Sequence, residues 1–329
     1  MSVLVCGGAG YIGSHAVAQL LDRNEEVIVV DNLQKGHRDA VLDGAVFYEG
    51  DLRDQTFINR VFEENSIDDV IHFAADSLVG ESVEQPLKYY DNNVHGAICL
   101  LKAMAEHNVK NIVFSSTAAV YGEPEQIPIQ ETDATDPTNP YGETKLAIEK
   151  LLKWAEKAYE IRYVILRYFN VAGADPDGRI GEDHRPETHL IPIILQVAQG
   201  KRDRIMIFGD DYPTDDGTCV RDYIHVHDLV NAHLLAIKKL NTNEVSGTYN
   251  LGNGQGFTVK EVIDAARRVT GHPIPAETAP RREGDPAQLV ASSEKANREL
   301  NWNPQHAEMD TMIQTAWDWF QAHPEGYEK

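Results

Sequence analysis

The stretch V-L-V-C-G-G-A-G-Y-I-G, residues 3–13, decides the fold. Its first four residues are apolar and include two valines, which predicts a fully buried parallel strand. Gly7, Gly10 and Gly13 follow at three-residue spacing, and a helical pattern begins at Ser14. Because glycine has no Cβ atom, the backbone N–H groups at such a helix N-terminus can approach a pyrophosphate directly. The stretch therefore predicts a dinucleotide-binding turn.

An acidic residue follows the next predicted strand, Glu26–Val30. Asp31 is placed to accept hydrogen bonds from the 2′- and 3′-hydroxyls of a ribose, and its charge repels a 2′-phosphate. The pattern therefore favours NAD over NADP, although Lys35 and Arg38 lie close enough in the sequence to leave NADP open. Strand, glycine turn, helix and acid together indicate a dinucleotide cofactor more strongly than the glycines alone.

The composition indicates a globular protein that binds neither nucleic acid nor an anionic membrane. Of the 329 residues, 42% are hydrophobic and 25% are charged, and the net charge of −22 would repel phosphate-rich partners. Cys6, Cys99 and Cys219 are scattered and show no metal-binding spacing, so we expect no metal site and a reducing, cytoplasmic environment. Anionic ligands would need local arginines and helix N-termini to outweigh the overall field.

The order of the elements predicts a Rossmann-type, doubly wound α/β fold with a parallel sheet. Strand and helix patterns alternate through the first half, which is typical of a sheet covered by helices on both faces. A loop rich in Gly, Pro and charge at 173–187 breaks this rhythm. We expect an NAD-binding domain at 1–172 and a smaller mixed α/β substrate lobe at 173–329, with about 208–250 returning to the first domain. The further expected strands are 45–48, 69–75, 111–117, 162–170, 204–208 and 248–251, and the expected helices are 87–107, 141–159, 190–200, 258–270, 293–300, 310–322 and one from near 226.

Three polar residues could carry out chemistry next to the cofactor. Tyr141 and Lys145 are four residues apart at the start of a predicted helix, which places them on one face. A tyrosine has a pKa of about 10, and a nearby ammonium together with a positive nicotinamide ring would lower that value toward neutral pH. Thr117 closes the fifth predicted strand, at the sheet edge where ligands of open α/β sheets bind. The three together predict a catalytic site.

Several longer motifs carry a resemblance to a known family. They are G-G-A-G-Y-I-G-S-H (7–15), D-N-L (31–33), G-D-L-R (50–53), V-I-H-F-A-A (70–75), V-G-E-S-V (79–83), Y-Y-D-N-N-V (89–94), L-R-Y-F-N (166–170), D-G-T-C-V-R-D-Y-I-H-V (216–226), Y-N-L-G (249–252) and A-P-R-R-E-G-D (279–285). With these motifs the chain resembles, nearly from end to end, the UDP-galactose (UDP-glucose) 4-epimerase family of extended short-chain dehydrogenases/reductases. The last three motifs are far more specific than the glycine turn, which the whole superfamily shares.

The resemblance implies a reversible interconversion of UDP-galactose and UDP-glucose through a transient 4-keto sugar. In this reading Tyr141 takes the proton of the 4-hydroxyl while NAD accepts the C4 hydride. Lys145 binds the nicotinamide ribose and lowers the pKa of the tyrosine, and Thr117 stands where many members carry serine. The resemblance also implies tightly bound NAD and no net redox change. The residues implied for the cofactor are Gly7, Gly10, Tyr11, Ile12, Gly13, Asp31, Asn32, Leu33, Gln34, Lys35, Gly36, Asp51, Leu52, Phe73, Ala74, Ala75, Ser77, Asn92, Thr117, Tyr141, Lys145 and Phe169.

On the substrate side the resemblance implies a UDP-sugar site, and between subunits a homodimer formed by the helices near 87–107 and 141–159. Arg221 and Arg282 suit the diphosphate because a guanidinium donates two hydrogen bonds in one plane. Their positive charges would also allow this acidic chain to bind an anionic ligand despite its negative overall charge. The residues implied for the UDP-sugar are Asn170, His189, Leu190, Met206, Ile207, Phe208, Arg221, Arg282, Asp285 and Leu289.

The chain departs from the family pattern at three places. Asp76-Ser77 replaces a basic residue that contacts the cofactor in several members, which puts cofactor affinity in doubt. Thr188-His189 replaces a paired asparagine, so that His189 either contacts the UDP or is a plain loop histidine. Leu289 stands where some members have a bulky tyrosine near the sugar. A smaller residue there should admit at least some N-acetylated UDP-hexosamines.

Other functions remain as alternatives. A nucleotide-sugar 4,6-dehydratase needs an acidic pair just after the fifth-strand hydroxyl, and a decarboxylating relative needs an acid at the second position. The chain has Ala118 and Ala119 there, and neither can shuttle a proton. A regulatory protein that binds NAD without catalysis is the alternative from another class, but such proteins commonly lose the tyrosine–lysine pair. Fold alone does not decide among these functions.

Overall fold

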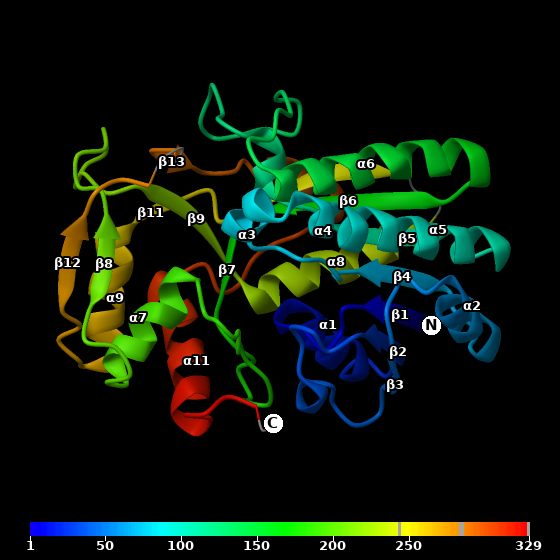
Figure 1. Cartoon of the computed structure of the whole chain (residues 1–329), viewed down its shortest axis with the longest axis horizontal. Coiled ribbons are helices and arrows are strands. Elements are labelled where there is room, and N and C mark those ends of the chain that lie inside the picture. The colour runs from blue at the N-terminus through cyan, green and yellow to red at the C-terminus, as the bar shows by residue number, and fades with distance from the viewer. Residues whose placement is uncertain (243–244, 283–285, 328–329) are drawn as a thin grey trace.

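The computed structural model describes residues 1–242, 245–282 and 286–327 (Figure 1). Asp285, predicted to bind substrate, lies outside these residues. Among the described residues, none of the helices has the length and hydropathy needed to span a bilayer.

The centre of the molecule is a seven-stranded parallel sheet with the strand order β10-β6-β5-β4-β1-β2-β3. Apart from β10, this is the order of a doubly wound dinucleotide-binding fold, whose crevice lies where the order reverses, between β1 and β4. The predicted fold class is confirmed. The strands are β1 (Ser2–Cys6), β2 (Glu26–Asp31), β3 (Val46–Glu49), β4 (Asp69–His72), β5 (Asn111–Ser115), β6 (Arg162–Tyr168) and β10 (Gly247–Leu251).

Helices cover both faces of this sheet because alternate strand residues point to opposite sides. Val3 and Val5 pack with α1 (Tyr11–Leu21) and α8 (Val226–Asn241) on one face. Leu4 and Cys6 pack on the other face with α2 (Gln55–Glu64), α5 (Gly96–Glu106) and α6 (Pro140–Tyr159). Further elements near these helices are η1 (Arg38–Ala40), α3 (Val79–Glu84), α4 (Pro86–Tyr89), η2 (Tyr90–His95) and η3 (Ala118–Tyr121).

A second group of elements lies beside the sheet, on the left in Figure 1. Its apolar core joins the helices α7, α9 and α11 to strands β8 and β9. The chain returns from this group through α8, which packs against β5 and β6, and through β10, which pairs with β6. The elements of this group are β7 (Asn170–Ala172), α7 (Leu190–Ala198), β8 (Ile205–Phe208), β9 (Val220–His225), β11 (Gly256–Thr258), α9 (Val259–Thr270), β12 (Ala276–Ala279), β13 (Gln288–Leu289) and α11 (Met309–Ala322). Helix α10 (Glu294–Leu300) packs instead on the large sheet, against β10 and α8.

The predicted strands 69–75 and 111–117 end earlier in the structure, at His72 and Ser115, and two other predicted elements are divided. The predicted strand at 162–170 is two strands, because β6 belongs to the large sheet whereas β7 pairs with β9 in a second sheet. The predicted helix at 87–107 contains a π-helical turn, η2, between α4 and α5. Such turns are frequent at functional sites.

Candidate active site

The glycine turn lies between the ends of β1 and β4. Gly7 has a φ of +82°, and a Cβ atom there would come within 2.6 Å of the backbone nitrogen of Ala74. At Gly13 a Cβ would lie 2.0 Å from the carbonyl oxygen of Gly7. Helix α1 begins after Gly10, and no side chain caps its N-terminus. The turn therefore leaves backbone N–H groups open to an anion, as a pyrophosphate site requires.

The acidic residue at the end of β2 is held in a fixed position. Asp31 accepts hydrogen bonds from the backbone nitrogens of Ala9 (3.0 Å) and Leu33 (2.8 Å). Burial raises the pKa of the Asp31 carboxyl, and these hydrogen bonds oppose the rise. A carboxylate oxygen can accept more than one hydrogen bond, so Asp31 can also bind ribose hydroxyls. These features fit an NAD molecule bound across the ends of β1 and β2.

The other residues predicted for the cofactor surround this turn. Asn32 donates to Asp51 (3.1 Å), and a salt bridge with Arg53 holds the pKa of Asp51 low. Gly36 packs closely against Ala9, and the Tyr11 hydroxyl donates to the carbonyl of Gly173 at 2.5 Å. The remaining predicted positions differ in exposure. Ser77 and Lys35 are exposed, Leu52 is buried in the core, and Ile12 and Phe73 are half-buried against the core. The others lie in the turn after β2 (Gln34), after β4 (Ala75), in η2 (Asn92) and between β6 and β7 (Phe169).

The structure brings the three predicted catalytic residues together. Asn139 caps the N-terminus of α6 through a 2.9 Å hydrogen bond with the backbone nitrogen of Gly142, which places Tyr141 in the first turn and Lys145 in the next. The Lys145 Nζ lies 5.9 Å from the centre of the Tyr141 ring and donates to the carbonyl of Ser115 at 2.8 Å. Thr117, two residues beyond β5, hydrogen-bonds Tyr141. The three side chains therefore meet at the carboxyl end of the sheet.

Burial controls the protonation of this group. It raises the pKa of Tyr141 to about 12, and the hydrogen bond with Thr117 opposes the rise. It lowers the pKa of Lys145 to about 7, against the attraction of Glu149. In the protein alone, desolvation thus outweighs the lowering of the tyrosine pKa that the sequence predicts. A phenolate at Tyr141 needs more positive charge, which the oxidised nicotinamide ring of a bound NAD would supply.

Buried polar residues behind the site were not found from the sequence. Glu149 accepts two hydrogen bonds from Arg167 (2.9 and 2.5 Å) and one from Ser116 (2.6 Å). Arg167 also donates a hydrogen bond to the hydroxyl of Tyr121 at 2.8 Å. Glu149 lies four residues after Lys145, on the same face of α6. That spacing could have revealed Glu149 from the sequence. The network holds β5, β6 and α6 in place relative to one another.

A positive charge lies near the departure at Asp76-Ser77. The Nζ of Lys88 is 3.8 Å from Asp76 and 2.8 Å from Glu81. Burial raises the pKa of Asp76, and Lys88 opposes the rise. Sequence reasoning missed Lys88 because it lies twelve positions downstream, in α4.

Most of the described residues predicted for substrate lie on strands of the second group, in β7, β8, β9 and β13. Arg221 in β9 is paired in register with Leu289 in β13. The guanidinium of Arg282 stacks 4.0 Å from the centre of the Phe208 ring. Asp222 holds the neighbouring loops by accepting the backbone nitrogens of Ala291, Asn253 and Gly254 (3.0, 2.7 and 3.3 Å), a role the sequence did not reveal.

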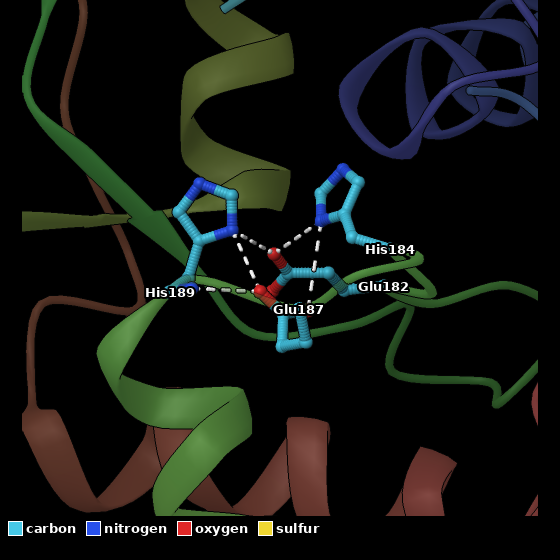
Figure 2. Close-up of side chains that lie close together, drawn as sticks. All are labelled: Glu182, His184, Glu187 and His189. Atoms are coloured by element: carbon cyan, nitrogen blue, oxygen red, sulfur yellow. Dashed lines mark hydrogen bonds and ion pairs between the residues drawn. The ribbon is translucent and has the colours of Figure 1, made fainter. Parts of the chain in front are cut away.

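The other predicted substrate residues do not all face the same way. Asn170 hydrogen-bonds Tyr223, and Met206 is half-buried in β8. The side chain of Ile207 is buried in the core, so only its backbone can reach a ligand. Leu190 begins α7, and the His189 ring is turned toward Glu182 and Glu187 (Figure 2).

These features define a dinucleotide-binding α/β protein with a tyrosine–lysine–threonine site. The chain belongs to the NAD dependent epimerase/dehydratase family, whose model matches residues 3–252. The resemblance drawn from the motifs is confirmed.

Known relatives cover the whole chain. It is 65% identical to a UDP-glucose 4-epimerase of Halalkalibacterium halodurans over 99% of this chain and 98% of that protein. A crystal structure of a UDP-glucose 4-epimerase superposes with a TM-score of 0.99, at 62% identity and complete coverage of both chains. The UDP-glucose 4-epimerase of Bifidobacterium longum in complex with NAD⁺ and UDP superposes with a TM-score of 0.94, at 43% identity over 99% of this chain and 100% of that one.

Proposed function

We propose that the chain interconverts UDP-galactose and UDP-glucose by transient oxidation of the sugar at C4, with NAD held throughout the cycle. The observation that carries this proposal is the meeting of Tyr141, Lys145 and Thr117 at the carboxyl end of β5, on the same edge of the sheet as the glycine turn. The full-length likeness to UDP-glucose 4-epimerases supports the same activity.

The residues divide the work as follows. Tyr141 removes the proton of the 4-hydroxyl as the C4 hydrogen leaves as a hydride, and it returns that proton when the hydride comes back. Lys145, fixed on the Ser115 carbonyl, supplies positive charge beside the phenolate. Thr117 hydrogen-bonds Tyr141 and stabilises its ionised form. A bound NAD would supply the acceptor and the donor of the hydride.

Inversion requires that the hydride return to the opposite face of the sugar. We propose that Arg221, Arg282 and Phe208 hold the nucleotide diphosphate while the hexose turns. Guanidinium groups suit this role because one guanidinium can donate two hydrogen bonds to a phosphate. Asn170, Leu190, Met206 and Leu289 line the same proposed site, together with the backbone at Ile207, whereas His189 is directed elsewhere.

The direct test is to incubate the purified protein with UDP-galactose, without added NAD, and to identify the product. UDP-glucose should form, and NAD should be released when the protein is denatured. Formation of a 4-keto-6-deoxy sugar would instead indicate a dehydratase. The alanines Ala118 and Ala119, which begin η3, argue against that outcome.

We further propose a homodimer formed through α3, α4, η2 and α6. Large apolar side chains are exposed on the first two of these elements, where Val83 is 61% and Leu87 83% exposed. Trp154 on α6 is 67% exposed. Apolar exposure of this kind marks interfaces, and light scattering on a Leu87→Glu variant should show monomers where the native chain gives dimers.

The cytoplasmic location remains a prediction from the cysteines. All three lie within the described part of the chain, are buried and form no disulfide.

A further inference from the structure

The loop between β7 and α7 contains a repeated sequence pattern that the proposed function does not use. Glu182-Asp183-His184 and Glu187-Thr188-His189 place Glu-x-His twice, five residues apart. The loop brings both pairs together, so that one ligand atom from each of the four side chains lies within 4.8 Å of the others.

The four side chains converge on one point (Figure 2). The Nδ1 atoms of His184 and His189 each lie 3.0 Å from the same oxygen of Glu182. The Nδ1 of His189 is also 3.0 Å from Glu187, and that of His184 is 3.6 Å from it. Ligand atoms of a tetrahedral zinc ion, with bonds of 2.0–2.2 Å, are separated by about 3.3 Å. The four histidine–glutamate separations, 3.0–3.6 Å, are close to that value, and all of the ligand atoms lie within 4.8 Å of one another.

The carboxylates are too buried to be ordinary surface acids. The Glu182 side chain is 6% exposed and that of Glu187 4% exposed. Two anions buried at one point need compensating positive charge. Two imidazolium rings, whose centres lie 5.1 Å apart, would supply it. A divalent cation between neutral imidazoles supplies the same charge from a single centre.

We propose that Glu182, His184, Glu187 and His189 bind a divalent transition-metal ion of the zinc class. Two imidazole nitrogens with two carboxylate oxygens are ligands that zinc accepts, and four protein ligands are typical of a structural site. The sequence predicted no metal because that prediction rested on cysteine spacing.

The ion would join the cofactor turn to the substrate side. The ring of Tyr11, in the glycine turn, packs edge-on to His184 with ring centres 6.2 Å apart. His189 is the N-cap of α7, which begins with Leu190. The site is therefore structural, and it holds this loop between the two proposed ligand-binding regions.

Metal content tests the proposal. The native protein, purified without chelator, incubated with Zn²⁺ and passed through gel filtration, should hold about one zinc per chain by elemental analysis. The His184→Ala/His189→Ala variant should lose at least about nine-tenths of it. A His95→Ala/His272→Ala variant removes two exposed histidines elsewhere and should retain the full amount. Far-ultraviolet circular dichroism shows whether each variant has folded.

A spectroscopic measurement on the native chain does not depend on any variant. Co²⁺ added to the chelator-treated native protein should give the intense visible absorption of a tetrahedral site, and Zn²⁺ should abolish it. Native protein that takes up neither ion would overturn the proposal. Equal zinc in the native protein and a folded His184→Ala/His189→Ala variant would overturn it too.

Discussion

At the scale of single residues, the chemistry depends on how Tyr141 is charged. Burial raises its pKa to about 12, so that in the protein alone the ring stays protonated at neutral pH. Lys145, Thr117 and the bound cofactor must together offset that desolvation. Loss of any one of these interactions should therefore lower kcat more than it lowers substrate affinity, because the phenolate is needed only while the proton is transferred.

Thr117 offers a graded test of this offset. Thr117→Val removes the hydroxyl but keeps the shape, and should lower kcat by about 10²-fold, since one hydrogen bond to the developing charge is lost. Thr117→Ser keeps the hydroxyl and should change kcat little. Steady-state turnover of UDP-galactose compares the two. Equal activity of the Val and Ser variants would show that the hydroxyl has no role.

We expect Leu289 to set how much room the proposed sugar site has. It packs with Phe169 against one small apolar cluster and is in register with Arg221. The native chain should turn over UDP-N-acetylgalactosamine, and Leu289→Tyr should lower that turnover at least about tenfold while sparing UDP-galactose, because a larger side chain excludes the acetyl group. Parallel assays on both substrates measure this. No detectable hexosamine turnover by the native chain would reject the expectation.

At the scale of elements, the positions of β5, β6 and α6 are set by the buried ion pair of Glu149 and Arg167. Neither side chain is more than 5% exposed. Breaking such a pair leaves an uncompensated buried charge. The pair also affects the site, because Glu149 attracts the ammonium of Lys145 and opposes the lowering of its pKa to about 7.

Glu149→Gln should therefore have two separate effects. Denaturant unfolding should show a loss of about 3 kcal/mol, since Arg167 becomes unpaired. The pKa of Lys145 should fall further, so that the alkaline limb of the kcat profile moves to lower pH. A destabilised variant with an unshifted pH profile would show that the pair is structural alone. The control is a Glu131→Gln variant, which alters an acid that accepts a hydrogen bond from the backbone nitrogen of Asn250 at 2.8 Å and has no part in the Glu149–Arg167 pair.

The elements also show how far sequence reasoning reaches. Strands such as β1 and β4 are predictable because a nearly continuous apolar run is typical of a parallel strand that is buried on both faces. β9 was missed because Asp222 interrupts its apolar pattern, and that carboxylate is buried only through hydrogen bonds from loops distant in sequence. Tyr141 and Lys145, the proposed catalytic residues, share one helix, so their spacing in the sequence predicted that they lie close together. The contacts at Glu182 and His189 depend on the folding of a loop, which no periodic pattern describes.

At the scale of the whole molecule, buried neutral histidines link stability to pH. Burial lowers the pKa of His15 and His233 to about 4, of His72 to about 3 and of His225 to about 2. As the pH falls below about 6.5 the unfolded chain binds protons at these positions while the folded chain does not. The folded state must therefore lose stability in that range.

This loss can be measured between pH 6.5 and 5, above the range where most carboxylates titrate. Each of these histidines should lower the free energy of unfolding by roughly 1 kcal/mol per pH unit. His72→Phe removes a ring whose two nitrogens both lack hydrogen-bond partners. The variant should therefore lose less unfolding free energy per pH unit than the native chain, by the contribution of one histidine. Urea unfolding at three pH values compares the variant with the native chain. A native free energy that is flat across this interval would contradict the assignment of neutral, buried rings.

At the scale of the whole molecule, the proposed epimerisation depends on the phenol of Tyr141 lying beside an NAD molecule that stays bound. The most direct measurement is the rate at which a Tyr141→Phe variant converts UDP-galactose to UDP-glucose, with bound NAD quantified in the same preparation. We predict that kcat falls by at least about 10²-fold while the NAD content stays at the native level. Undiminished conversion by a variant that still holds NAD would contradict the account.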